Sequence, residues 1–327
     1  MKNRTGKLTA IILCSIIAVS CMSACGGNDN DKKGTKKHIV ATIFPEYDWA
    51  REIVGDINDT ELTLLLSNGV DMHSYQPSVD DIMTISTCDM FIYVGGESDG
   101  WVRDALAQAS NKDMIVIDLM SVLGDRAKEE ELVSGMEAEH GDEENGSDEK
   151  EYDEHVWMSL ENAELFCDHI TEGLVKLDGA HAEEYKRNCG TYKDKLEKLK
   201  GEYKKTADAS QERTIIVGDR FPYKYLTDEF GIKYYAAFPG CSAETDASFE
   251  TIVFLAGKAD EVGARAIIKT EASDGSVAMT VRDNTATKDQ EILTLDSLQS
   301  VSAKDIDAGT SYYSVMEKNL DVLKRAL

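Results

Sequence analysis

Short apolar runs alternate with segments of helical periodicity along most of the chain. Runs rich in β-branched and aromatic residues predict strands, and apolar residues at every third or fourth position predict helices between them. The predicted strands are His38–Ile43, Leu62–Leu66, Met90–Val94, Met114–Ile117, Thr214–Val217, Tyr234–Ala237, Ala266–Lys269 and Ile292–Thr294. The predicted helices include Tyr47–Val54, Ser78–Ser86, Trp101–Ala109 and Leu160–Leu177. This alternation is typical of α/β proteins.

The longest helical pattern lies between Ala180 and Thr206, where apolar residues recur at alternating spacings of four and three. They form one apolar stripe, with Lys and Glu on the other faces. The stripe consists of Tyr185, Cys189, Tyr192, Leu196, Leu199 and Tyr203. At about 1.5 Å per residue such a helix reaches about 40 Å, which is long enough to run along two domains. A coiled-coil dimer would need a more regular heptad register, so we interpret the pattern as a backbone helix.

These elements predict two α/β lobes, each with a central sheet flanked by helices, joined by the long helix. The predicted boundaries are 38–178 for the N-terminal lobe, 179–208 for the linking helix and 209–327 for the C-terminal lobe. An apolar fraction of 42% is sufficient for two cores of this size.

The first residues predict export from the cytoplasm. A basic start over residues 1–7 precedes an apolar stretch over residues 8–19. This stretch is too short for a membrane-spanning helix and is typical of the core of a signal peptide. A plain secretory signal and a lipoprotein signal share these features, and both place the mature chain outside the cytoplasm.

Small residues precede Cys25, and two glycines follow it. This arrangement resembles the lipobox of bacterial lipoproteins, which implies a signal peptide over residues 1–24 and a lipid on Cys25. Cys21 is the alternative site of lipid attachment. Polar residues dominate up to residue 37, so we expect residues 25–37 to be the lipidated cysteine and a flexible tether.

Composition and motifs exclude several classes of function. The formal net charge of −26 argues against nucleic-acid binding, which relies on basic patches. The later cysteines are widely spaced and form no CxxC pair, so we expect free thiols rather than a disulfide framework or a structural zinc site. A metallohydrolase would need an open metal position and a general base, and the chain has no HExxH or phosphate-loop motif. We therefore predict that the protein is not an enzyme.

Two histidines lie in unusual surroundings. His73 belongs to GVDMHSYQPS (residues 69–78), which follows a predicted strand and opens a helix. A loop at the end of such a strand is placed to face a cleft. His155 belongs to YDEHVWMS (residues 152–159), at the end of an acidic segment.

The combination resembles the zinc- and manganese-binding solute-binding proteins of ABC transporters, over nearly the whole mature chain. The two histidine motifs correspond to the patterns G-x-D-x-H-x-Y-x-P and D-x-H-x-W-x-S of that family. The long central helix and the ending DAGTSYYSVMEKNLDVLKRAL (residues 307–327) add to the likeness. The resemblance implies two α/β lobes joined by a rigid helix, with a metal site in the cleft between the lobes.

The resemblance also implies metal ligands. His73 and His155 match the two histidines of the N-terminal lobe, and Asp296 matches the aspartate of the C-terminal lobe. The family carries His or Glu at one further position, where this chain has Gly218. Candidates to replace that ligand are Asp219, the next residue, and Glu271, which follows a predicted strand. A third candidate is Cys241, and Asp219 has a helix cap or an ion pair with Arg220 as its alternative role.

Two imidazoles and two carboxylates suit zinc, and manganese is the alternative because it accepts more oxygen ligands. Glu and Asp dominate the segment over residues 129–154, which we expect to be an unpacked acidic loop with a single histidine, His140. This loop lies where zinc-binding members of the family carry a mobile acidic loop. Its charge would steer cations toward the cleft, although a solvated loop without a role is the alternative.

We therefore predict an extracytoplasmic lipoprotein, held at the cell membrane by its lipid, that captures Zn²⁺ and delivers it to the permease of an ABC importer. The predicted state is a monomer. A manganese- or iron-specific member of the same family and a surface lipoprotein with a role in cell adhesion, as described for some relatives, are the alternatives.

Overall fold

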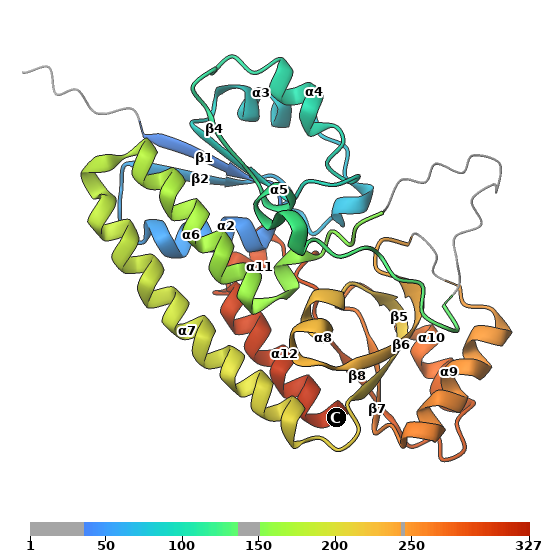
Figure 1. Cartoon of the computed structure of the whole chain (residues 1–327). Helices are drawn as coiled ribbons and strands as arrows, with labels where there is room; N and C mark the ends of the chain where they lie inside the picture. Colours follow the sequence, from blue (N-terminus) through green and yellow to red (C-terminus); the bar gives the residue numbers. More distant parts are fainter. Residues whose placement is uncertain (1–35, 137–150, 243–245) are drawn as a thin grey trace, which may run out of the picture. The chain divides into compact units, whose positions relative to one another are not determined.

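The computed structural model describes residues 36–136, 151–242 and 246–327 (Figure 1). The predicted signal peptide, the lipid anchor at Cys25 and almost all of the tether lie outside the described residues. Within the described ranges, no helix combines the length and the apolar character that crossing a membrane requires.

The N-terminal lobe contains a four-stranded sheet in the order β2-β1-β3-β4, with all neighbouring strands parallel. Its strands are β1 (Lys37–Ala41), β2 (Thr60–Leu64), β3 (Met90–Tyr93) and β4 (Ile115–Asp118). Its helices are α2 (Phe44–Val54), α3 (Val79–Thr87), α4 (Val102–Ala107), α5 (Leu119–Leu123) and α6 (Leu160–Leu177). Short 3-10 turns are η1 (Met72–Ser74), η2 (Gly124–Arg126), η3 (Val156–Met158) and η4 (Gly179–His181).

The C-terminal lobe repeats this plan with a second parallel sheet in the order β6-β5-β7-β8. Its strands are β5 (Thr214–Phe221), β6 (Lys233–Pro239), β7 (Ala266–Lys269) and β8 (Glu291–Thr294). Its helices are α8 (Lys224–Phe230), α9 (Phe249–Val262), α10 (Ser276–Asp283), α11 (Ala303–Asp307) and α12 (Tyr312–Ala326). The predicted fold class is therefore confirmed, and every predicted strand exists within a few residues of its expected bounds.

Helix α7 (Ala182–Ala209) joins the two lobes and runs along both (Figure 1). All six residues of the predicted apolar stripe are buried, and the stripe packs against α2, α6 and α12. The last helix, α12, returns to the N-terminal lobe, where the amide of Tyr312 donates to Asp48 of α2 at 2.7 Å. One continuous cluster of buried side chains includes residues of both sheets, so the lobes share a core.

The acidic segment differs from the prediction at its two ends. Glu129 and Tyr152 form an antiparallel bridge, and the amide of Asp153 donates to the carbonyl of Lys128 at 2.9 Å. Asp153 and Glu154 are buried. The expectation that the whole segment remains unpacked is therefore wrong at its two ends, residues 129–130 and 151–154, where the backbone is paired or the side chains are buried. The middle of the segment, with His140, lies outside the described residues.

The shared core makes the stripe of α7 important for stability. We expect Leu196→Ala to lower the free energy of unfolding by about 2–5 kcal/mol, because the fully buried Leu196 side chain would leave a cavity. Urea denaturation followed by circular dichroism measures the change. Lys198→Ala on the exposed face of the same helix is the control and should change it by less than about 0.5 kcal/mol. Equal effects of the two substitutions would contradict the assignment of the stripe.

Candidate metal centre

His73 lies in the turn η1, close to the end of strand β2. The carboxylate of Asp71 caps this turn, since its Oδ1 accepts the amide of His73 at 3.0 Å. The other oxygen of Asp71 forms an ion pair with Arg220 of β5 at 2.9 Å. The turn that carries His73 is thus held by its own lobe and by the opposite lobe.

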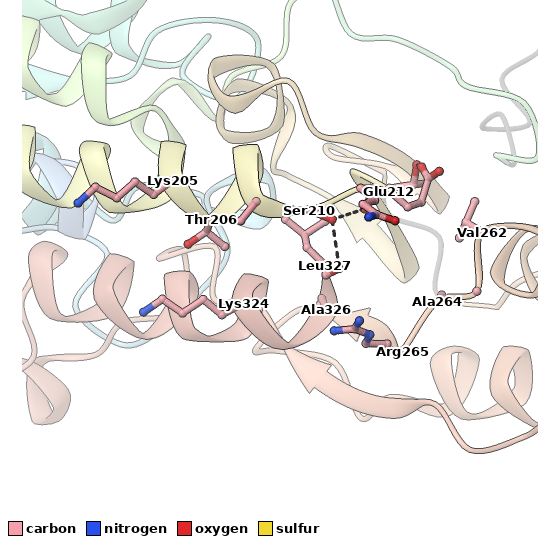
Figure 2. A pocket seen from close by; sticks show the side chains of 14 residues that line it. Lys205, Thr206, Ser210, Glu212, Val262, Ala264, Arg265, Lys324, Ala326 and Leu327 are labelled. Atoms are coloured by element: carbon pink, nitrogen blue, oxygen red, sulfur yellow. Dashed lines mark hydrogen bonds between the residues drawn. The ribbon is translucent and has the colours of Figure 1, made fainter.

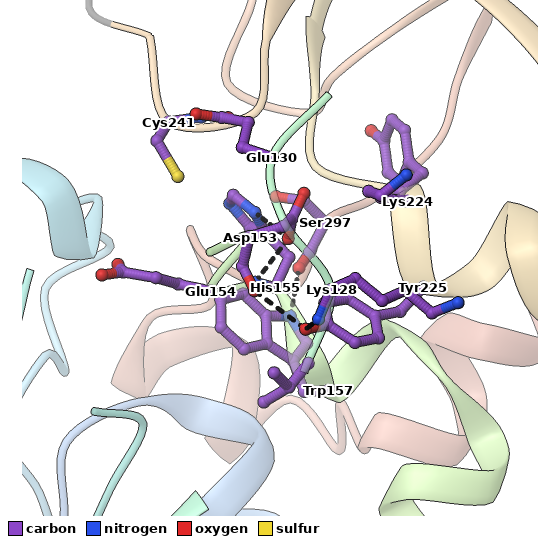
Figure 3. A network of polar contacts seen from close by, with 12 residues as sticks. Lys128, Glu130, Asp153, Glu154, His155, Trp157, Lys224, Tyr225, Cys241 and Ser297 are labelled. Atoms are coloured by element: carbon purple, nitrogen blue, oxygen red, sulfur yellow. Dashed lines mark hydrogen bonds and ion pairs between the residues drawn. The ribbon is translucent and has the colours of Figure 1, made fainter. Parts of the chain in front are cut away.

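His155 is fully buried at the start of η3. Asp153 holds it through two contacts, from the His155 amide at 2.8 Å and to the ring Nδ1 at 3.0 Å. Two residues further on, the indole Nε1 of Trp157 donates to the carbonyl of Ser297 at 2.8 Å (Figure 3). The segment that carries His155 is therefore fastened to the loop after β8.

The two histidines face one another through their Nε2 atoms, which lie 3.2 Å apart. Each ring uses its Nδ1 for support, from Ser98 Oγ at 2.8 Å for His73 and from Asp153 for His155. Metal-binding histidines are oriented in this way by a partner on the second nitrogen. Two nitrogens at about 2.0–2.1 Å from a tetrahedral zinc ion lie about 3.3–3.4 Å apart. The observed spacing therefore fits a shared tetrahedral metal ion.

The pair titrates asymmetrically. Burial, followed by the charge of His155, lowers the pKa of His73 to about 4. Burial also disfavours the charged form of His155, but the charge and hydrogen bond of Asp153 outweigh it and raise the pKa of His155 above its usual value. Near neutral pH, His73 is therefore neutral, and His155 is the ring of the two that accepts a proton more readily.

A cleft of about 650 Å³ opens beside the histidines and is lined by residues of both lobes. Among the described residues that line it there are no Lys or Arg side chains, and the acidic ones are Glu97, Glu130, Glu151 and Glu154. Burial is the main reason why the pKa values of Glu130 and Glu154 are raised above their ordinary values. A cation in the cleft would stabilise the charged form of both carboxylates.

Asp296 lies in the loop after β8, next to the Ser297 carbonyl that Trp157 binds. Its Oδ1 accepts the amide of Leu298, a buried residue with a positive φ of 66°. A leucine in this conformation is strained, and such strain is concentrated at functional loops. Burial and the neighbouring Glu271 raise the pKa of Asp296 to about 6. Both oxygens of Glu271 accept hydrogen bonds from Ser297, at 2.8 and 2.7 Å.

Asp219 directs its oxygens into its own lobe. Its Oδ2 accepts the amide and the hydroxyl of Thr270, at 2.9 and 3.0 Å, and its Oδ1 accepts the amide of Arg220. The side chain of Arg220 pairs with Asp71 instead. Asp219 thus ties the end of β7 to β5.

Gly218 cannot carry a side chain in this packing. A Cβ atom at this position would lie 2.5 Å from the Cα of Ala278 in α10, where contacts below 3.0 Å are essentially never seen. The backbone of α10 therefore occupies the space that a ligand side chain at residue 218 would need.

The thiol of Cys241 is the side chain that comes closest to completing a site with the histidines. One ligand atom from each of His73, His155 and Cys241 lies within 4.8 Å of the other two. Within the described ranges Asp296, Asp219 and Glu271 are not members of such a group. From the sequence, Cys241 is only the third candidate for the missing ligand, because a single cysteine has no characteristic spacing to other ligands.

Two other features fall outside this centre. Asp59, Asp178 and His181 form a second group of potential ligands at the start of α7, where Asp178 and His181 make an ion pair at 2.6 Å. A pocket of about 810 Å³ lies at the opposite end of the second sheet, near Leu327 (Figure 2). Its charged lining includes Lys205, Arg265 and Lys324, which does not suit a cation.

Comparisons with known proteins agree with this architecture. The chain matches the family model described as ZnuA, zinc-uptake complex component A, periplasmic, over residues 39–326. It is 28% identical over 329 residues to the high-affinity zinc uptake system protein ZnuA of Bacillus subtilis (strain 168), with 100% of this chain and 99% of that protein covered.

A further relative, AdcA of Streptococcus pneumoniae, is similar to this chain both in sequence and in structure. The zinc-binding lipoprotein AdcA (strain ATCC BAA-255 / R6) is 28% identical over 317 residues, which cover 96% of this chain and 59% of AdcA. This chain thus spans about three fifths of that protein. The crystal structure of the Zn(II)-bound ZnuA-like domain of AdcA has a TM-score of 0.69 and 25% identity, with 89% of this chain and 98% of the domain covered.

The two parallel-sheet lobes, the joining helix and the acidic cleft define a binding protein of two α/β lobes. Within this class the chain belongs to the ZnuA family of zinc-uptake components. The resemblance drawn from the histidine motifs is confirmed.

The packing at Gly218 predicts that the family ligand cannot simply be restored. We expect Gly218→His to lower the free energy of unfolding by about 1–3 kcal/mol or more, because its Cβ would overlap the backbone of α10. Thermal and urea denaturation measure the effect. Gly190→Ala is the control, because open space surrounds Gly190 in α7 and the substitution should stabilise by roughly 0.5–1 kcal/mol. A stable Gly218→His variant would show that α10 does not close this position.

Proposed function

We propose that this protein captures Zn²⁺ outside the cytoplasm and hands it to the membrane permease of an ABC importer. The observation that carries the proposal is the pair of Nε2 atoms at 3.2 Å, each on a ring supported at its other nitrogen. An imidazole pair at the spacing of a tetrahedral zinc site, beside a cleft whose described lining residues include no Lys or Arg, supports metal capture rather than binding of an organic solute.

In this proposal His73 and His155 are the ligands from the N-terminal lobe, and Asp296 is the carboxylate ligand from the C-terminal lobe. The raised pKa of Asp296 supports this role, because a cation would relieve its repulsion by Glu271. Glu271 holds the loop of Asp296 through Ser297, and Asp219 holds the end of β7 through Thr270. Both are supporting residues in the proposal.

Two imidazoles favour zinc over manganese, which prefers a larger number of oxygen ligands. A preference for manganese or iron would keep the transport function and change the metal. The glutamates of the cleft and the acidic segment raise the local concentration of cations and so assist capture at low metal concentration.

We further propose that a lipid on Cys25 holds the mature protein at the membrane, and that it works as a monomer with lobes at 38–178 and 209–327. The shared core and the ion pair between Arg220 and Asp71 support a stiff arrangement of the lobes. Metabolic labelling with a radioactive fatty acid tests the anchor. Label that persists in Cys25→Ser and disappears in Cys21→Ser would move the anchor to Cys21.

Metal binding is the central test. We expect the purified protein, stripped with chelator, to bind one equivalent of Zn²⁺ more tightly than Mn²⁺ in calorimetric competition. Each of these substitutions removes one proposed bond to the metal. His73→Ala and Asp296→Ala should therefore each weaken zinc binding by at least about tenfold.

The control for this test is His169→Ala, because His169 lies on α6 and its ring bonds to the carbonyl of Leu165 in its own helix. It should bind zinc as the unaltered protein does, with unchanged circular dichroism. If neither metal binds with defined stoichiometry, the uptake function is wrong for this chain and the adhesion alternative gains support.

The affinity for zinc should depend on pH. His155 has a raised pKa and must lose its proton to bind metal, so the affinity falls below that pKa by about tenfold per pH unit. Asp296, with a pKa of about 6, adds a second proton and a steeper loss below pH 6. Zinc titrations between pH 7.5 and 5 measure the slope. An affinity that stays constant over this range would exclude both residues as ligands.

A further inference from the structure

We propose that the thiolate of Cys241 is the zinc ligand that replaces the side chain missing at Gly218. The inference rests on the proposed function and specifies its site: two imidazoles, one thiolate and the carboxylate of Asp296. Zinc would then have four ligands, two from each lobe, as in a closed tetrahedral site.

The geometry of the three described groups is close to that of a bound ion. Their ligand atoms all lie within 4.8 Å of one another, and the imidazole nitrogens are already 3.2 Å apart. In a tetrahedral site with Zn–S near 2.3 Å and Zn–N near 2.0–2.1 Å, sulfur and nitrogen lie about 3.5–3.6 Å apart. To complete the site, the sulfur of Cys241 has to come closer to the imidazoles, through its side-chain torsion or through its loop.

The backbone before Cys241 is built for this approach. Strand β6 ends at Pro239, and Gly240 follows directly against His155. A Cβ at Gly240 would lie 2.9 Å from the carbonyl oxygen of Phe221 and 3.1 Å from Nδ1 of His155. Only glycine fits this close approach, and it brings the next side chain to the imidazoles. In Figure 3 the side chain of Cys241 points toward His155.

Cys241 also differs from the other described cysteines in its surroundings. Cys88, Cys167 and Cys189 are buried in the hydrophobic core. Cys241 is partly exposed and lines the acidic cleft, where its amide donates to Oε1 of Glu130 at 3.3 Å. A thiol in this position serves no packing role comparable to that of the core cysteines, and it meets the cations that enter the cleft.

The chemistry of the step balances without a further reactant. A zinc–sulfur bond forms as the S–H bond of Cys241 breaks, and the proton passes to solvent through the open cleft. A thiolate is a soft ligand that favours Zn²⁺ strongly over Mn²⁺. Cys241 would therefore strengthen the preference for zinc beyond what two imidazoles and two carboxylates provide.

Cobalt(II) gives a direct test, because a cobalt–thiolate bond produces an intense charge-transfer absorption in the near ultraviolet. We expect this band when Co²⁺ is added to the chelator-stripped protein, and we expect it to be absent in Cys241→Ser. The same substitution should weaken Zn²⁺ binding by at least about tenfold and change Mn²⁺ binding much less. Bound Zn²⁺ should also protect Cys241 from alkylation by iodoacetamide, as measured by mass spectrometry of its peptide.

Cys88→Ser is the matched control, because Cys88 lies at the end of α3 and donates to the carbonyl of Ile85, a bond that serine can keep. It should retain the cobalt band and the zinc affinity. If the protein binds Co²⁺ and loses it in His73→Ala but never shows the charge-transfer band, Cys241 is not a ligand and the proposed function stands. If the unaltered protein binds neither Zn²⁺ nor Co²⁺, the proposed function fails together with this inference.

Discussion

The hydrogen bond from the indole of Trp157 to the carbonyl of Ser297 is the contact on which the arrangement of the site depends. Trp157 is fully buried, and its own carbonyl accepts the hydroxyl of Tyr312 at 2.7 Å. One peptide segment therefore joins His155, the loop of Asp296 and helix α12. In the protein interior, a buried donor or acceptor that lacks its partner destabilises the fold by about 1–3 kcal/mol. The lobes are thus held in register next to the histidines.

This rigidity explains how a cluster of acidic groups survives in a partly buried cleft. Burial raises the pKa of Glu130 and of Glu154 in this cleft, and the charge of Asp153 adds to the rise at Glu130. Burying these carboxylates lowers the stability of the fold, and the packing of apolar side chains along α7 and α12 offsets this loss. A divalent cation would offset the cost of burying these carboxylates. That cost therefore favours the capture of metal in the cleft.

Two glycines at the site act in opposite ways. At Gly218 the backbone of α10 occupies the space of a side chain, so this position contributes no ligand. At Gly240 the absence of a side chain lets the loop after β6 reach His155 and places Cys241 beside both imidazoles. Strands β5 and β6 end side by side. The loop after β6 can therefore bring Cys241 to the region where Gly218 of β5 offers no side chain.

Local pattern alone determined the strands, the long helix and the two histidine motifs. Strand and helix periodicity report burial directly, which is why the stripe from Tyr185 to Tyr203 was predicted residue by residue. The tertiary structure decided which thiol and which carboxylates meet the histidines. Asp219 turned into its own lobe, and the ends of the acidic segment paired with each other. The approach of Cys241 to His155 arises from contacts between residues 86 positions apart in the chain, and such distant contacts leave no periodic signal in the sequence.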